Sequence, residues 1–190
     1  TYNVGLRFLE LGEFTRNRMD IYETVRPEAE TLAEKTGEMV NAAVEEHGQG
    51  VYITRHGGQQ AVNVDTYAGK RVNLHCTALG KAILAELPEA RVDEILDEHG
   101  MPERTEHTVT DPDELKAELE TVREQGIAYD REERLPGLRC VAAPVVTDSV
   151  VAALSVSGPT TRIKGETFHE EIPELLLSAA NVVEINMAYS

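Results

Sequence analysis

The chain has 190 residues, of which 34 are Asp or Glu and 18 are Lys or Arg, so its formal net charge is −16. A chain of this length forms one domain, or one domain with a short appendage, and it can bury a core without a disulfide or a structural metal. Nucleic-acid binding requires clustered Lys and Arg, so the charge balance excludes a domain that grips nucleic acid by itself.

The acidic surplus points to a salty environment. A surface this acidic repels itself in dilute buffer, whereas molar salt shortens the Debye length to about 3 Å and screens the repulsion. We therefore expect a halophilic host with a salty cytoplasm, and an ordinary acidic bacterial protein is the alternative. The basic residues comprise only five Lys against 13 Arg.

The cysteines and the hydropathy of the chain indicate where in the cell the protein is located. Cys76 and Cys140 lie far apart with no CxxC pairing, which is typical of a reducing compartment. The apolar stretches are too short for a membrane span, and residues 1–20 have no signal-peptide layout. The sequence therefore predicts a cytoplasmic protein that does not associate with a membrane.

The first part of the chain predicts two helices followed by strands. Apolar residues at helical spacing indicate a short helix over residues 4–14, and a second helix runs from Asp20 to Gly37. Strands are expected at Met39–Glu45, Gly50–Arg55 and Ala61–Thr66. Because it opens abruptly on an exposed helix, the chain resembles a piece of a longer protein.

The second part predicts alternating helices and hairpin strands. Helices are expected at Thr77–Leu87, at Arg91–Glu98, from Asp111 to Gln125 and over residues 166–189. Strands are expected at Ile127–Asp130, Leu138–Thr147 and Val150–Gly158. Hairpins with helices between them predict an α+β fold, with a mostly antiparallel central sheet and helices packed on its faces.

The last hairpin predicts a polar wall. If residues 148 and 149 form its loop, Ala142 lies opposite Ser155 and Cys140 lies opposite Ser157. Side chains alternate along a strand, so these four share one face, while the other face is apolar and belongs to the core. A thiol, two hydroxyls and small methyl groups can form a site for a small polar ligand. The alternative is a tight helix–sheet contact made by small residues.

The segment from His75 to Lys81 is a second candidate. A polar loop enters a helix here, and the unpaired N–H groups at a helix start favour a bound anion. The segment lacks the upstream Gly and the following Ser or Thr of a phosphate-binding loop, which argues against nucleotide binding. We expect Lys81 to be salt-bridged, or to extend its ammonium to the surface, rather than to be catalytic.

Two other chemistries remain open. A nucleophilic enzyme could pair Cys140 with His75 and Asp130, and a metal site could form from His75, Cys76 and Cys140. No local motif supports either one. The acidic pairs are expected to be solvated surface; they are Glu45-Glu46, Glu132-Glu133 and Glu170-Glu171.

A series of segments in order carries a family resemblance. These segments are Leu9–Gly12, Leu32–Glu38, Val51–Ile53, Leu74–Ala85, Gly126–Glu133, Gly137–Val145 and Ala153–Pro159. Together they resemble the effector-binding C-terminal domain of IclR-type transcriptional regulators, and the resemblance covers essentially the whole chain.

The resemblance implies a GAF-like fold and a sensory role without catalysis or a cofactor. Residues 19–190 would be the effector-binding domain, and residues 1–18 would end the helix that connects it to a winged helix-turn-helix absent from this sequence. Operator DNA would be bound only through that absent module. The family also implies self-association as a dimer or tetramer, and an effector that is a small carboxylate or aromatic acid.

The resemblance also assigns residues to the effector site. The backbone of Ala78 and Leu79 would receive a ligand carboxylate. The polar side would be lined by Asp130, Cys140, Ser155 and Ser157, and the apolar wall would include Val64 and Val72. An enzyme that uses Cys140, or a dimerisation module with a vestigial pocket, are the alternatives.

Overall fold

The computed structural model describes residues 5–189, so Val4, where the first predicted helix begins, lies outside the described residues. One six-stranded sheet forms its centre, in the order β3-β2-β1-β6-β5-β4, and neighbouring strands are antiparallel. The strands are β1 (Met39–Glu46), β2 (Gln49–Gly57), β3 (Arg71–Val72), β4 (Ala128–Arg131), β5 (Leu138–Val146) and β6 (Val151–Pro159). The helices are α1 (Arg7–Arg16), α2 (Asp20–Thr36), α3 (Ala78–Glu86), α4 (Glu89–His99), α5 (Pro112–Gln125) and α6 (Ile172–Ala188).

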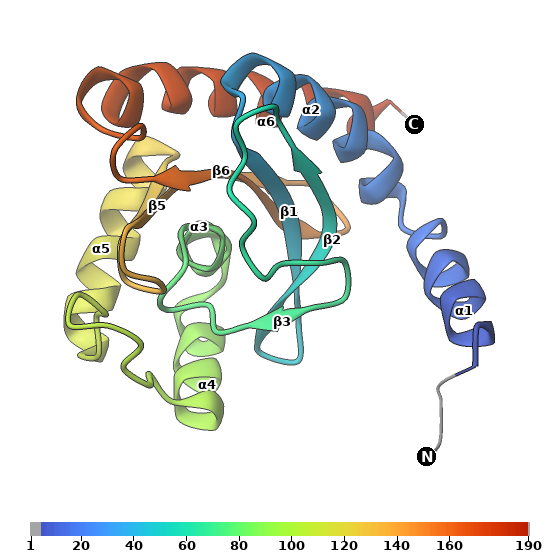
Figure 1. Cartoon of the computed structure of the whole chain (residues 1–190). Coiled ribbons are helices and arrows are strands. Elements are labelled where there is room, and N and C mark those ends of the chain that lie inside the picture. Colours follow the sequence, from blue (N-terminus) through green and yellow to red (C-terminus); the bar gives the residue numbers. More distant parts are fainter. Residues whose placement is uncertain (1–4, 190) are drawn as a thin grey trace.

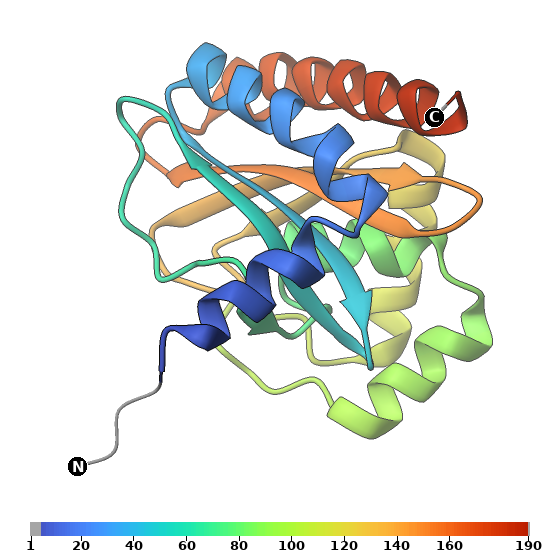
Figure 2. The same cartoon turned by 90° about the vertical axis from the view of Figure 1, so that its right-hand side faces the viewer.

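Helices cover both faces of the sheet, as Figures 1 and 2 show. Helices α2 and α6 lie along one face, and Val40 and Val156 of the central strands pack into the core between them and the sheet. Helices α3 and α5 cover the other face, where Ala43 and Ala142 belong to a second core cluster. The α+β class predicted from the hairpins is confirmed.

The register predicted for the last hairpin is also confirmed. Cys140 is paired with Ser157 and Ala142 with Ser155. The Thr147 amide donates to the Val150 carbonyl at 3.1 Å, which closes the turn between β5 and β6.

The strand predicted over residues 61–66 is wrong, because these residues form part of a loop between β2 and β3. In that loop the Val64 amide donates to the carbonyl of Val62, and the Thr66 amide donates to that of Val64. These local bonds use the amides that a strand would offer to its neighbour. The third strand is instead the two-residue β3, which pairs with Gly50 and Val51.

The final helix begins with a π-helical turn, η1 (Thr167–Glu171), and continues as α6. Pro173 has no N–H to donate four residues back, which favours a widened turn at this point. The aspartate predicted to cap α5 does so, because Asp111 Oδ1 accepts from the amides of Asp113 (2.8 Å) and Glu114 (3.1 Å).

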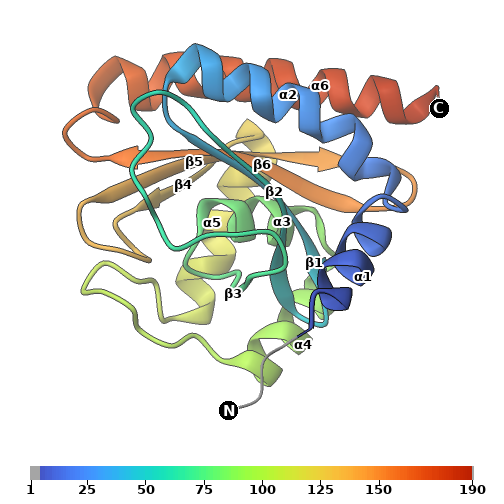
Figure 3. The ribbon, with the colours of Figure 1, turned by 45° about the vertical axis from the view of Figure 1, so that its right-hand side comes forward.

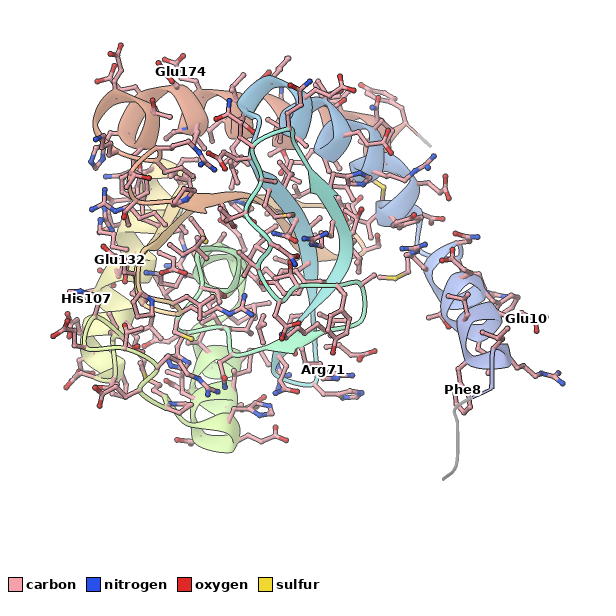
Figure 4. All side chains as sticks on the ribbon, in the orientation of Figure 1. Phe8, Glu10, Arg71, His107, Glu132 and Glu174 are labelled. Carbon is pink, nitrogen blue, oxygen red and sulfur yellow. The ribbon has the colours of Figure 1, made fainter. Side chains whose placement is uncertain are left out.

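Helix α1 extends away from the domain body. None of its residues is buried, and Phe8 and Leu9 are 68% and 66% exposed. Figure 4 shows Phe8 and Glu10 on this outlying helix. The rest of the chain carries the core, so α1 is structurally an appendage to it.

Candidate functional site

The start of α3, the α3-facing side of the sheet and the loop that joins β2 to β3 lie close to one another (Figure 3). Residues from these three parts line a cavity. Its empty volume, including the part open to solvent, is about 350 Å³. Seven of the eight residues predicted for the effector site line it, namely Val64, Ala78, Leu79, Asp130, Cys140, Ser155 and Ser157.

Val72 does not line this cavity, which corrects its predicted place in the apolar wall. In β3 the side chains alternate, so that Arg71 is exposed and Val72 is buried in the second core cluster. There it belongs to the packing that supports α3 rather than to the cavity lining.

The sheet register places the polar residues in rows across four strands. Asp130 on β4 is paired with Cys140, Cys140 is paired with Ser157, and Ser157 is paired with Met39 on β1. Paired residues of antiparallel strands point to the same face. The carboxyl, the thiol and the hydroxyl therefore lie side by side on the cavity side of the sheet.

The N-terminus of α3 faces this polar row. Thr77 caps the helix, because its Oγ1 accepts from the Gly80 amide at 3.0 Å. The amides of Ala78 and Leu79 have no partner within the helix, because the first-turn N–H groups never do. Gly80 permits this placement: a Cβ there would lie 2.1 Å from the Leu74 carbonyl oxygen. The helix start can therefore bind an anion in the cavity.

Asp130 is a buried acid in the cavity wall. Burial raises its pKa to about 7, and the nearby Glu133 carboxylate acts in the same direction. The Glu133 amide, which donates to Asp130 Oδ1 at 2.8 Å, opposes the rise. An ionised Asp130 would repel a carboxylate in the cavity. Near neutral pH Asp130 can be present as a neutral acid, which does not repel an anion.

The Cys140 thiol is not an activated nucleophile. Burial raises its pKa well above the usual range, and Asp130 raises it further. His75 does not line the cavity; its Nε2 lies 3.2 Å from the Pro102 carbonyl oxygen. The structure therefore does not bring His75 to Cys140 as a base. Within residues 5–189, no three His, Cys, Asp or Glu side chains are grouped so that they could hold a metal ion.

Glu133 is buried, which corrects its predicted place on the solvated surface. Its Oε1 accepts from Lys81 Nζ at 2.7 Å, and the same ammonium donates to Glu118 Oε1 at 2.7 Å. Lys81 is fully buried, so of the two alternatives for this residue the salt bridge is confirmed. Its ion pairs join α3 to α5 and to the segment after β4.

The residues predicted for the site did not include every residue that lines the cavity; among those missed are Asn41, Tyr52 and Arg134. Arg134 donates to Tyr52 Oη at 2.8 Å across 82 positions of sequence, a contact that only the tertiary structure creates. Asn41 could have been singled out from the sequence, because it is the single polar residue within the apolar run from Met39 to Val44.

A basic hollow adjoins the cavity and shares Thr77 and Arg134 with it. The charged side chains that line the hollow are all basic; they are Lys70, Arg71, Arg104 and Arg134. Among the described residues, no carboxylate lies within 4.0 Å of Arg104 or Arg134, so their charges are available to an anion. Although the chain as a whole has a net charge of −16, the hollow is a region of local positive charge that attracts acids.

Comparison with known proteins identifies the family. Residues 14–184 match the family described as bacterial transcriptional regulator IclR C-terminal. The chain belongs to the IclR family of transcriptional regulators. None of the helices within residues 5–189 combines the length and the apolar composition needed to cross a membrane.

Curated relatives in the IclR family are longer than this chain. The probable transcriptional regulator ArcR of Halobacterium salinarum is 33% identical over 98% of this chain and 73% of its own length. KdgR of Dickeya chrysanthemi is 32% identical over 95% of this chain, which spans 60% of that regulator.

Solved IclR structures share the fold. The IclR of Thermotoga maritima superposes with a TM-score of 0.90 at 33% identity, over 97% of this chain and 75% of that one. An IclR homologue of Microbacterium hydrocarbonoxydans, solved in complex with 4-hydroxybenzoate, superposes with a TM-score of 0.84 at 26% identity, over 99% of this chain and 76% of that one. The α+β domain is therefore the C-terminal domain fold of the family.

Proposed function

We propose that residues 19–190 bind a small organic acid in the cavity and thereby regulate a DNA-binding module to which residues 1–18 connect. The observation that carries the proposal is the α3 N-terminus, whose amides at Ala78 and Leu79 face the polar row of Asp130, Cys140 and Ser157. An acid can place its carboxylate on the helix N-terminus and its polar end on the sheet.

Three further features support this function. The basic hollow beside the cavity would attract an anion, and the raised pKa of Asp130 would lessen repulsion within the site. The Microbacterium homologue was solved with an acid bound, and this chain shares its fold. The cavity is small, so we expect an acid of few atoms, with Val64, Ser155 and the remaining lining residues enclosing it.

The domain would act as a regulator rather than as an enzyme. A ligand shifts an equilibrium between two arrangements by its difference in affinity for them, without chemical change. The arrangements would be those of a dimer or tetramer in the cytoplasm, with operator DNA bound only through the N-terminal module and with no cofactor. Burial raises the pKa of the Cys140 thiol, and His75 is not placed to act as its base, which disfavours the alternative of a nucleophilic enzyme.

The test is acid binding by a variant that lacks one helix-start amide. Thr77 has φ −132° and ψ 143°, the extended conformation that a following proline requires, and position 78 is the first of α3. Ala78→Pro should therefore keep the helix and remove one donor. Calorimetric titration with acetate, glycolate, benzoate and 4-hydroxybenzoate should show binding to the wild type that the variant weakens about tenfold to a hundredfold.

The matched control is Glu89→Pro, which places proline at the first position of α4, outside the cavity lining. It should bind the acids as the wild type does. If Ala78→Pro binds them equally well, the carboxylate does not lie on α3. If none of the four acids binds the wild type or raises its melting temperature, a dimerisation module with a vestigial pocket is favoured instead.

A further inference from the structure

Asn41 is an anomaly within the core. It is 2% exposed in β1, and the side chains around it from Met39 to Val44 are apolar. Among the described residues its Oδ1 has no hydrogen-bond partner. A buried acceptor without a partner is unfavourable, so an asparagine is retained at such a position only when something else offsets that cost.

The register places this side chain on the cavity side of the sheet. Asn41 is paired with Ser155 of β6, and Ser155 is paired with Ala142 of β5. This row lies next to the one that contains Cys140 and Ser157, and Asn41 lines the same cavity. The side chain of Asn41 is therefore part of the cavity wall.

Three other polar groups of the cavity already have partners within the protein. Tyr52 Oη accepts from Arg134, Thr77 Oγ1 caps α3, and Asp130 Oδ1 accepts from the Glu133 amide. An amide oxygen can only accept, so its missing partner must be a donor, and a ligand carboxylate cannot supply one. A hydroxyl group can.

We propose that Asn41 determines effector specificity by accepting a hydrogen bond from a hydroxyl group of the ligand, so that the effector is a hydroxy acid. This inference rests on the proposed function and extends it. The ligand's carboxylate lies on the amides of Ala78 and Leu79, and its hydroxyl lies against β1. A site built to pair with a ligand hydroxyl discriminates against the analogue that lacks it.

The experiment compares matched pairs of acids with and without a hydroxyl group. The pairs are glycolate and acetate, lactate and propionate, and 3- or 4-hydroxybenzoate and benzoate. In at least one pair the wild type should bind the hydroxylated acid about tenfold more tightly. Asn41→Leu, of similar size but without an acceptor, should bind both members with the affinity of the wild type for the plain acid.

The control is Thr54→Val in the neighbouring strand β2. Thr54 is also buried, but its Oγ1 lies 2.7 Å from His56 Nε2, and it does not line the cavity. This variant should keep the preference for the hydroxy acid and lose thermal stability. Asn41→Leu should instead melt at the wild-type temperature or about 2–4 °C above it, because it removes an unpaired polar group.

Each other outcome overturns the inference in a distinguishable way. If the wild type binds both members of every pair equally, or if Asn41→Leu keeps the preference for the hydroxylated acid, Asn41 does not accept a hydrogen bond from a ligand hydroxyl group. The proposed function would then still stand. If Asn41→Leu loses as much stability as Thr54→Val, Asn41 is a structural residue. If no acid binds at all, the proposed function fails and this inference fails with it.

Discussion

At the scale of single residues, Asp130 determines how the cavity responds to pH. Its pKa is about 7 in the folded chain against an ordinary value of 3.8. The folded state therefore holds this proton more tightly than the unfolded state does. Its contribution to the free energy of unfolding is fully present below about pH 4 and is lost as the pH rises to about 7.

Asp130→Asn should remove this pH dependence. The wild type should bind an acid more weakly as the pH rises from 6 to 8, by at most about tenfold per pH unit, because ionised Asp130 repels a carboxylate. The variant should bind with the same affinity across that range and should be more stable than the wild type above pH 7. Calorimetric titration and thermal melting at several pH values measure both effects.

Asp148→Asn is the control for that change of one charge, because Asp148 is exposed in the β5–β6 turn. It should leave the pH dependence of acid binding as in the wild type. Equal slopes for Asp130→Asn and the wild type would show that Asp130 does not titrate against the ligand.

At the scale of elements, the ion pairs of Lys81 connect α3 to its neighbours. Its buried ammonium joins α3 to the partly exposed Glu118 of α5 and to the buried Glu133 after β4. Because Glu133 follows Asp130 by three residues and donates its amide to it, the same ion pair fixes one wall of the cavity. The segment after β4 is thus positioned by charge as well as by packing.

Lys81→Met should lower the free energy of unfolding by about 3–5 kcal/mol, because it leaves Glu133 buried without its partner. Adding Glu133→Gln should restore part of the loss, since a neutral amide costs less to bury than an unpaired carboxylate. Denaturant unfolding of the three proteins measures this. A double variant that is less stable than Lys81→Met would mean that Glu133 stabilises the fold through other contacts.

Lys116→Met serves as the comparison for Lys81→Met. Lys116 lies on the surface of α5, where it pairs with Asp93 and Glu89 of α4. Solvent screens such a pair, so its loss should change the unfolding free energy far less.

At the scale of the whole molecule, the net charge of −16 sets the conditions in which the fold is stable. Self-repulsion of the surface is reduced by salt, so the melting temperature should rise from low to molar KCl. Sucrose of equal osmolality controls for solute effects that do not depend on charge. A melting temperature that does not change with KCl would contradict adaptation to a salty cytoplasm.

Local patterns of the sequence determined the helices, the α+β class and the last hairpin. Capping of α5 by Asp111 depends on residues two and three positions away, and the register of β5 and β6 depends only on their short turn. That register alone placed Cys140 and Ser157 together on one face. The family resemblance added Asp130 and the start of α3, which come from distant parts of the chain.

Only the tertiary structure decided which residues from distant segments come into contact. The segment around Val64 has the alternating pattern of a strand, but it forms a loop in which Val64 lines the cavity. Val72 packs in the core and does not line the cavity. The acidic pattern around Glu133 cannot reveal that Lys81 lies beside it. Asn41 faces the cavity only because β1 pairs with β6 in one register. Local spacing fixes neighbours along a strand or helix, whereas burial and partners across the sheet depend on which elements pack together.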